Sequence, residues 1–80
     1  MDKQAKLEKC QNALDMIKGF PSKAACIVKY TIENLEVTEK EFVEQSAQAI
    51  PDNHQDYVKA MMRFINDSLK NKMREMGYLS

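Results

Sequence analysis

The sequence predicts an all-α protein, a compact bundle of four helices with a long C-terminal helix. Residue types that favour helices, among them Ala, Leu, Glu, Lys, Gln and Met, are abundant. Apolar residues recur every three or four positions, which is the period of a helix that packs on one side. Only two glycines and two prolines interrupt the 80 residues. We therefore expect a single helical domain, residues 1–80, with a thin core.

The first two helices are predicted at residues 3–18 and 22–34. The sequence GFPS at 19–22 separates them, because its glycine favours a helix end and its proline cannot continue the preceding helix. Each helix has one apolar side. That side consists of Leu7, Cys10, Leu14 and Ile17 on the first helix, and of Ala24, Ile27, Val28, Thr31 and Leu35 on the second.

The third helix is predicted at residues 38–49. It begins with a capping box, in which the hydroxyl of Thr38 can accept a hydrogen bond from the amide of Glu41. Phe42, Val43 and Ala47 form its inward side. The sequence IPDN at 50–53 then stops the helix.

The fourth helix is predicted at residues 53–77, with Asp52 or Asn53 as its N-cap and Gly77 as its C-terminal stop. At roughly 24 residues it would be ~36 Å long. The third helix is about half as long and cannot cover it. Either the first helix lies along the rest of it, or its end protrudes. Its apolar seam is Val58, Met61, Ile65, Leu69, Met73 and Met76.

The seam has two interpretations. It can be core throughout, or core that continues into an interface, because methionine adapts to irregular partners and an apolar stripe that protrudes into water usually marks a contact. For an interface we predict apolar contacts and basic residues that steer the partner. The apolar contacts are Met62, Ile65, Leu69, Met73 and Met76, and the steering residues are Arg63, Lys70 and Arg74.

Charge is balanced overall but unevenly distributed. The net charge is zero, so there is no overall field to attract a polyanion. Residues 35–56 carry six acidic side chains and one lysine, whereas residues 57–80 carry five basic and two acidic side chains. The two segments can lie side by side in one fold, or they can form two oppositely charged contact surfaces.

Few residues suit catalysis or metal binding. His54 is the only histidine, and Asp52 and Asp56 beside it are typical of a helix start. Cys10 and Cys26 do not form a CxxC pair, and we expect small buried residues that face each other across a helical hairpin. The alternative is a redox pair, which requires a thiol pKa well below the usual value. We expect no metal, cofactor or small-molecule substrate.

The segment 32–50 resembles the helix-turn-helix of DNA-binding regulators. Leu35, Glu36, Val37 and Thr38 follow the pattern of an apolar residue, a polar residue, Val and a Ser or Thr that opens the next helix. The resemblance implies that the helix beginning at Thr38 would enter the major groove. Glu36 departs from the glycine usual in that turn. The helix at 38–49, which would enter the groove, also carries three glutamates, which phosphates would repel.

We therefore expect a small non-enzymatic protein that presents the apolar face of its last helix to another protein or to a second copy of itself. It would act as a regulator, inhibitor or adaptor. A nucleic-acid-binding regulator that uses residues 32–50 is the alternative. The N-terminal segment has no apolar core typical of a signal peptide, and no apolar run approaches the ~20 residues that span a bilayer. We expect a cytoplasmic protein that binds no membrane, with reduced thiols.

Overall fold

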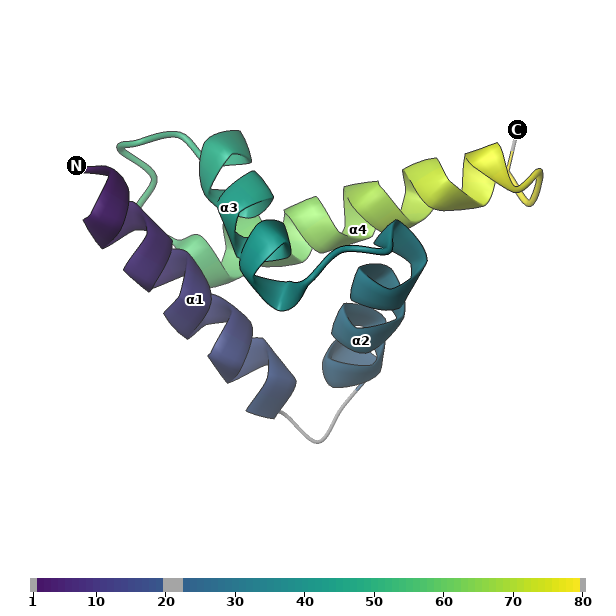
Figure 1. Ribbon diagram of the computed structural model, residues 1–80, viewed down its shortest axis with the longest axis horizontal. Helices are drawn as coiled ribbons and strands as arrows, with labels where there is room; N and C mark the ends of the chain where they lie inside the picture. The colour runs from purple at the N-terminus through teal and green to yellow at the C-terminus, as the bar shows by residue number, and fades with distance from the viewer. Residues whose placement is uncertain (1, 20–22, 80) are drawn as a thin grey trace.

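The computed structural model describes residues 2–19 and 23–79, and this part of the chain is folded as four helices with no strand (Figure 1). The predicted all-α bundle is therefore confirmed. The predicted break at 19–22 falls mostly on residues 20–22, which lie outside the described residues. None of the described helices is long and apolar enough to cross a membrane. The helices are α1 (Lys3–Gly19), α2 (Lys23–Leu35), α3 (Glu39–Ala49) and α4 (Tyr57–Glu75).

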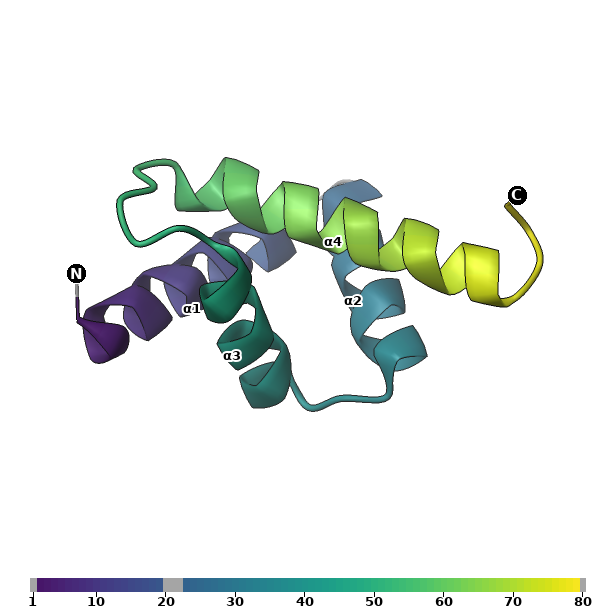
Figure 2. The same cartoon turned by 90° about the horizontal axis from the view of Figure 1, so that it is seen from above.

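Helices α1 and α4 organise the bundle. Helix α1 packs against each of the other three, and α4 packs mainly against α1 and α2 (Figures 1 and 2). The longest dimension of the molecule is 38 Å, and it runs roughly along α4. The layout therefore gives α4 neighbours over its first part and leaves its C-terminal end beyond the others.

The core lies where the apolar sides of all four helices meet. Phe42 of α3 is fully buried, and its ring meets that of Phe64 of α4 edge-on, with centroids 5.5 Å apart. The spacing of three and four residues that predicted the helices is the spacing of the buried side chains. The buried apolar residues are Cys10, Ala13, Leu14, Ile17, Val28, Phe42, Val43, Ala47, Ile50, Tyr57, Met61 and Ile65.

Helix α3 begins as predicted. The hydroxyl of Thr38 accepts a hydrogen bond from the backbone N–H of Glu41 at 3.1 Å, which satisfies one of the first amides of the helix. Near its other end, the Ser46 hydroxyl donates to the carbonyl of Phe42 at 2.8 Å inside the core. A buried polar side chain is thereby satisfied within its own helix.

The predicted start of the fourth helix is wrong by about one turn. Helix α4 begins at Tyr57, and its N-cap is Asp56, whose carboxylate accepts from the backbone N–H of Lys59 at 3.0 Å. The preceding residues form a turn instead, in which the N–H of His54 donates to the carbonyl of Pro51 at 3.0 Å. Asp52, the expected cap, is held elsewhere by Lys6 of α1, with Nζ and Oδ1 2.9 Å apart. Helix α4 is thus 19 residues long rather than the expected 24 or so.

The turn between α2 and α3 contains a strained residue. Glu36 has a φ of 56°, in the left-handed region that favours glycine. It directly follows the last residue of α2, and its N–H donates to the carbonyl of Glu33 at 3.2 Å. The backbone therefore adopts the usual glycine conformation of a helix end at a position occupied by glutamate.

The two cysteines have opposite environments. Cys10 is fully buried in the core, Cys26 is exposed on α2, and both are free thiols. The expectation that both are buried and face each other is therefore wrong for Cys26. Burial raises the pKa of the Cys10 thiol above its ordinary value, although the nearby Lys6 opposes the shift. That direction is opposite to the one a redox thiol at Cys10 requires.

Two ion pairs join α1 to residues 35–56, which we call the acidic segment. Lys18 lies 2.9 Å from Glu39 at the start of α3, and Lys6 holds Asp52 in the turn before α4. The hydrogen bond from Lys18 is the main cause of a lowered pKa at Glu39, with a further bond from Gln11. The hydrogen bond from Lys6 likewise lowers the pKa of Asp52. Both carboxylates are therefore favoured in their charged form in the fold.

We expect Glu36→Gly to stabilise the protein. Glycine removes the steric cost of the left-handed conformation, and after the added freedom of the unfolded chain the net gain is about 0.5–1 kcal/mol. Urea denaturation followed by circular dichroism measures it. The matched control is Glu33→Gly inside α2, which should cost about 1 kcal/mol. Equal losses in both variants would contradict the assignment.

We expect one fast thiol per folded chain. A maleimide or a disulfide reagent should modify Cys26 readily and Cys10 at least about 100-fold more slowly, because Cys10 becomes accessible only on opening of the core. Mass spectrometry of peptides from timed samples separates the two sites. Cys26→Ser should leave no fast thiol, and in denaturant both cysteines should react alike. Fast modification of Cys10 in the native protein would refute its burial.

Acid should weaken the two ion pairs of α1. Because both carboxylates have a folded pKa below the ordinary value of about 4, their contribution to stability is complete above that value. It is lost as the pH falls through the lowered folded pKa. Glu39→Gln with Asp52→Asn should therefore flatten the decrease of the melting temperature between about pH 5 and pH 2. The matched control, Glu41→Gln with Glu44→Gln, should follow the wild-type pH profile.

Candidate functional site: the C-terminal half of α4

Helix α4 faces the core with only its first half. Tyr57, Met61 and Ile65 are buried, and Met61 and Ile65 have no exposed surface. At about 100° per residue, the mean direction of Tyr57, Met61 and Ile65 is next occupied by Ser68 and Lys72, which are polar and half-buried. The side of the helix that points into the core therefore stops being apolar after Ile65.

The last turns of α4 extend past the other helices. Two perpendicular views show its last turns beyond the end of α2, with no other helix alongside (Figures 1 and 2). Leu69 and Met73 in the second half of α4 are half-buried, and neither is among the residues that pack against the described core. Met76 is 47% exposed. We call Leu69, Met73 and Met76 the distal stripe.

The distal stripe occupies a narrow strip of the helix surface. At about 100° per residue its three members fall within an arc of about 60°. Met62 falls in the same arc about two turns before Leu69, where it is half-buried and packs against the core. The stripe is thus continuous with the core at one end and open at the other.

One member of the predicted contact set is corrected. Ile65 was expected to touch a partner, but its side chain has no exposed surface and belongs to the core. Sequence spacing alone could not separate it from Leu69, because both fall on the same broad apolar side of α4. The other predicted apolar residues, Met62, Leu69, Met73 and Met76, retain partial or full exposure.

The end of α4 is well formed despite its position. Gly77 adopts a φ of 85°. Two backbone hydrogen bonds then close the helix: the N–H of Tyr78 donates to the Met73 carbonyl at 2.9 Å, and the N–H of Gly77 donates to the Arg74 carbonyl at 3.0 Å. This is a Schellman motif, and it confirms Gly77 as the stop. The chain then places Tyr78 and Leu79, 70% and 39% exposed, next to the stripe in sequence.

Tyr78 and Leu79 were missed by the sequence prediction. Both follow the glycine that was expected to end the helix, so helical periodicity gave no reason to count them with the seam. The signal that could have found them is the Schellman motif itself, because the residue after its glycine is commonly apolar and returns toward the last turn.

Basic residues line one side of the stripe. Arg63, Lys70 and Arg74 are all exposed, and they lie about 100–140° around the helix axis from Leu69, in the same direction. The exposed Asp67 lies beyond them on this side, at about 160°, so the side as a whole remains positive. We call these three residues the basic edge. Among the described residues none of them is in an ion pair, and Arg74 donates only to the side-chain oxygen of Asn71, at 3.2 Å.

The other side of the stripe is close to neutral. There Lys72 lies 3.8 Å from Glu75, one turn along the same helix, and the half-buried Ser68 precedes them. The basic edge and this paired side therefore differ in charge across the width of one helix.

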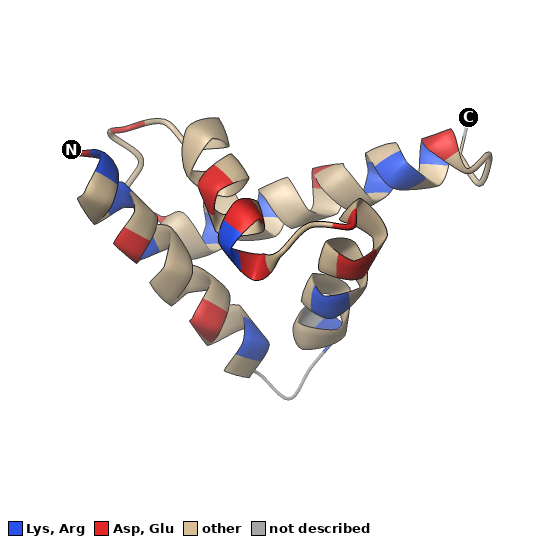
Figure 3. Ribbon diagram, viewed as in Figure 1, with Lys and Arg blue, Asp and Glu red and all other residues tan. Residues whose placement is uncertain are grey.

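The acidic segment does not neutralise the basic edge. Figure 3 shows acidic residues gathered on α3, and lysine and arginine bands on the distal turns of α4 with acidic bands among them. The ion pairs that involve the start of α3 and the following turn reach back to α1. Within the described chain, no ion pair joins the acidic segment to the distal half of α4. The uneven charge of the sequence thus persists as an exposed basic strip.

The segment 32–50 has the local turn of a helix-turn-helix without its usual packing. Its two helices, α2 and α3, pack mainly against α1 and α4 rather than against each other. The solvent-facing side of α3 includes Glu41 and Glu44. These carboxylates would meet phosphates if α3 entered a groove.

His54 is a half-buried residue of the turn before α4. Its ring meets the ring of Tyr57 edge-on, with centroids 6.3 Å apart. Its Nε2 atom is buried and has no hydrogen-bond partner among the described residues. No group of three His, Cys, Asp or Glu side chains within the described ranges is arranged to hold a metal ion.

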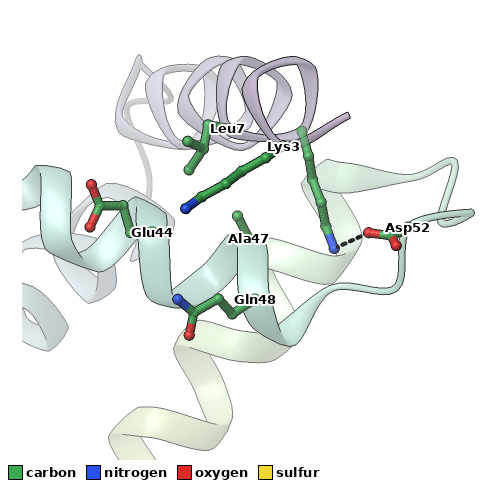
Figure 4. A pocket seen from close by; sticks show the side chains of 7 residues that line it. Lys3, Leu7, Glu44, Ala47, Gln48 and Asp52 are labelled. Carbon is green, nitrogen blue, oxygen red and sulfur yellow. Dashed lines mark hydrogen bonds and ion pairs between the residues drawn. The ribbon is translucent and has the colours of Figure 1, made fainter. Parts of the chain in front are cut away.

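A groove of about 440 Å³ lies between α1 and α3 (Figure 4). Leu7 and Ala47 supply its apolar wall, and Lys3 extends into it between Glu44 and Ala47. Lys6 at its edge is already paired with Asp52. The groove therefore presents charges of both signs around a small apolar wall.

Comparisons with known proteins add no assignment to these features. The function is therefore argued from the residues of α4 and their surroundings. No protein-family model, no curated protein and no solved structure matches the chain.

Proposed function

We propose that this protein is a small non-enzymatic interaction module that binds another protein through the distal half of α4. The observation that carries the proposal is the distal stripe: Leu69, Met73 and Met76 continue the apolar surface of α4 beyond the bundle that covers its first half. An ordered apolar strip on the surface of a small domain is typical of a protein contact. By occupying a surface of its partner, α4 would let the protein act as a regulator, an inhibitor or an adaptor.

The energetics favour this use of the stripe. Complete burial of a leucine or methionine side chain is worth about 1.5–3 kcal/mol relative to exposure. Three side chains that are half-buried or exposed leave part of this free energy for a partner to gain. The Schellman motif holds the helix end in its bound shape beforehand, so binding loses less conformational entropy there.

The basic edge contributes to encounter rather than to most of the affinity. Arg63, Lys70 and Arg74 are exposed, and exposed charges mainly raise the association rate and select the partner. Methionine supports the same function, because its flexible thioether adapts to an irregular surface. A cytoplasmic location is part of the proposal, since both cysteines are free thiols and one of them is exposed.

Nucleic-acid binding through α3 is the weaker candidate. The turn at Glu36 and the cap at Thr38 are compatible with a helix-turn-helix. The exposed face of α3, however, carries Glu41 and Glu44, and α2 gives α3 little support. These carboxylates therefore disfavour nucleic-acid binding through α3.

We expect Leu69→Glu with Met73→Glu to abolish partner binding without unfolding the protein. Both side chains lie outside the core, so the loss of stability should stay near 1 kcal/mol, whereas Ile65→Ala in the core should cost about 2–5 kcal/mol. Circular dichroism and thermal melts measure the fold. Quantitative affinity capture from extracts of the source cells, with light scattering at two protein concentrations, measures binding.

The matched control is Met16→Glu, because Met16 is a 55% exposed methionine on α1 outside the stripe. It should retain every partner that the double variant loses. If the double variant unfolds, the stripe is part of the core and the proposal fails. Equal capture by the wild type and the double variant, with an unchanged mass in solution, also contradicts it.

A further inference from the structure

We infer that the partner segment that binds the distal stripe is an amphipathic helix with an acidic edge, supplied by a different protein. This inference rests on the proposed function and names the partner's chemistry. It depends on three features of α4: the width of the stripe, the one-sided charge beside it, and the lack of a complementary surface on a second copy of the chain.

The width of the stripe suits one helix. Leu69, Met73 and Met76 supply about one apolar residue per turn within an arc of about 60°, which is the seam of a two-helix contact. A sheet edge or a flat surface would need a broader apolar face. Figure 2 shows the last turns of α4 extending past α2, so no helix of the bundle lies alongside this end of the seam.

The charge beside the stripe favours an acidic partner. Arg63, Lys70 and Arg74 flank only one side and are without ion-pair partners among the described residues. On the other side Lys72 already pairs with Glu75. Residues that flank a helical seam set the choice and the orientation of the partner. A partner helix with Glu or Asp along one flank would meet all three cations.

A second copy of α4 does not meet this requirement. Most homodimers are two-fold symmetric, and two α4 helices that pack antiparallel across such an axis place each flank against its own counterpart. In a parallel pair each basic edge would face the opposite flank, where the carboxylate of Glu75 already pairs with Lys72. In the antiparallel pair the basic edge of one copy would face the basic edge of the other. Like charges in these positions are destabilising.

The acidic helix of a second copy is also unsuitable. Helix α3 carries exposed Glu41 and Glu44, but its apolar residues Phe42, Val43 and Ala47 are buried in its own core. An occupant of the distal stripe needs both the acidic flank and a free apolar seam. Helix α3 offers the flank without the seam, so we assign the occupant to another protein.

Two synthetic peptides test the inference. Each is a helix of about three heptads with the same leucine seam, and its flanking positions are all Glu in one peptide and all Lys in the other. Fluorescence anisotropy with the full-length protein should show at least about tenfold tighter binding of the Glu peptide at low salt. The preference should shrink as the ionic strength rises from about 0.05 to 0.5 M.

Variants locate the effect. Lys70→Glu with Arg74→Glu should reverse the preference toward the Lys peptide. The matched control, Lys23→Glu with Lys29→Glu, reverses two exposed charges on α2 and should leave the preference unchanged. Leu69→Glu with Met73→Glu should abolish binding of both peptides.

Other outcomes would overturn the inference. Equal binding of the two peptides, lost in the Leu69 and Met73 variant, would show apolar docking without charge selection and would leave the proposed function intact. A mass that doubles with concentration, while neither peptide binds, would identify a second copy as the occupant. If neither peptide binds and the protein stays monomeric, the inference fails, and the capture experiment alone decides the proposed function.

Discussion

The burial of Ile65 is the constraint on which the rest of the molecule depends. Ile65 is the last fully buried residue of α4, and the side chains beyond it are half-buried or exposed. Extending a formed helix is favourable once its first turns are fixed, because each added residue gains one hydrogen bond. Packing of the first half of α4 thus supports the second half of the same helix. The Schellman motif at Gly77 ends that second half.

The same constraint determines the surface chemistry. Because the core-facing side of α4 turns polar at Ser68 and Lys72, burying that side further would gain the bundle little hydrophobic free energy. The remaining apolar residues, Leu69, Met73 and Met76, lie to one side of that seam, and the basic edge lies beyond them. Meanwhile Lys6 and Lys18 of α1 pair with Asp52 and Glu39, two of the carboxylates of the acidic segment. The cations of α4 are therefore left for a partner.

Helix ends that depend on hydrogen bonds within one turn were predicted correctly. Where several neighbouring residues could serve as the cap, the prediction was wrong. Thr38 and Gly77 were predicted correctly, since each acts through hydrogen bonds to residues within one turn. The start of α4 was wrong because Asp52, Asn53 and Asp56 are all acceptable caps by residue type. The choice among them depends on the ion pair between Asp52 and Lys6, residues 46 positions apart. No local pattern contains that pairing.

The sequence by itself determined that the chain is helical, roughly where each helix lies, and that its last helix has more apolar length than α3 can cover. Only the tertiary structure decided which apolar residues are core and which are available. Ile65 and Leu69 are one turn apart and equally apolar, as Cys10 and Cys26 are equally small. Their different exposure follows from where neighbouring helices end in space. Burial is a property of the assembled bundle, whereas periodicity is a property of one helix.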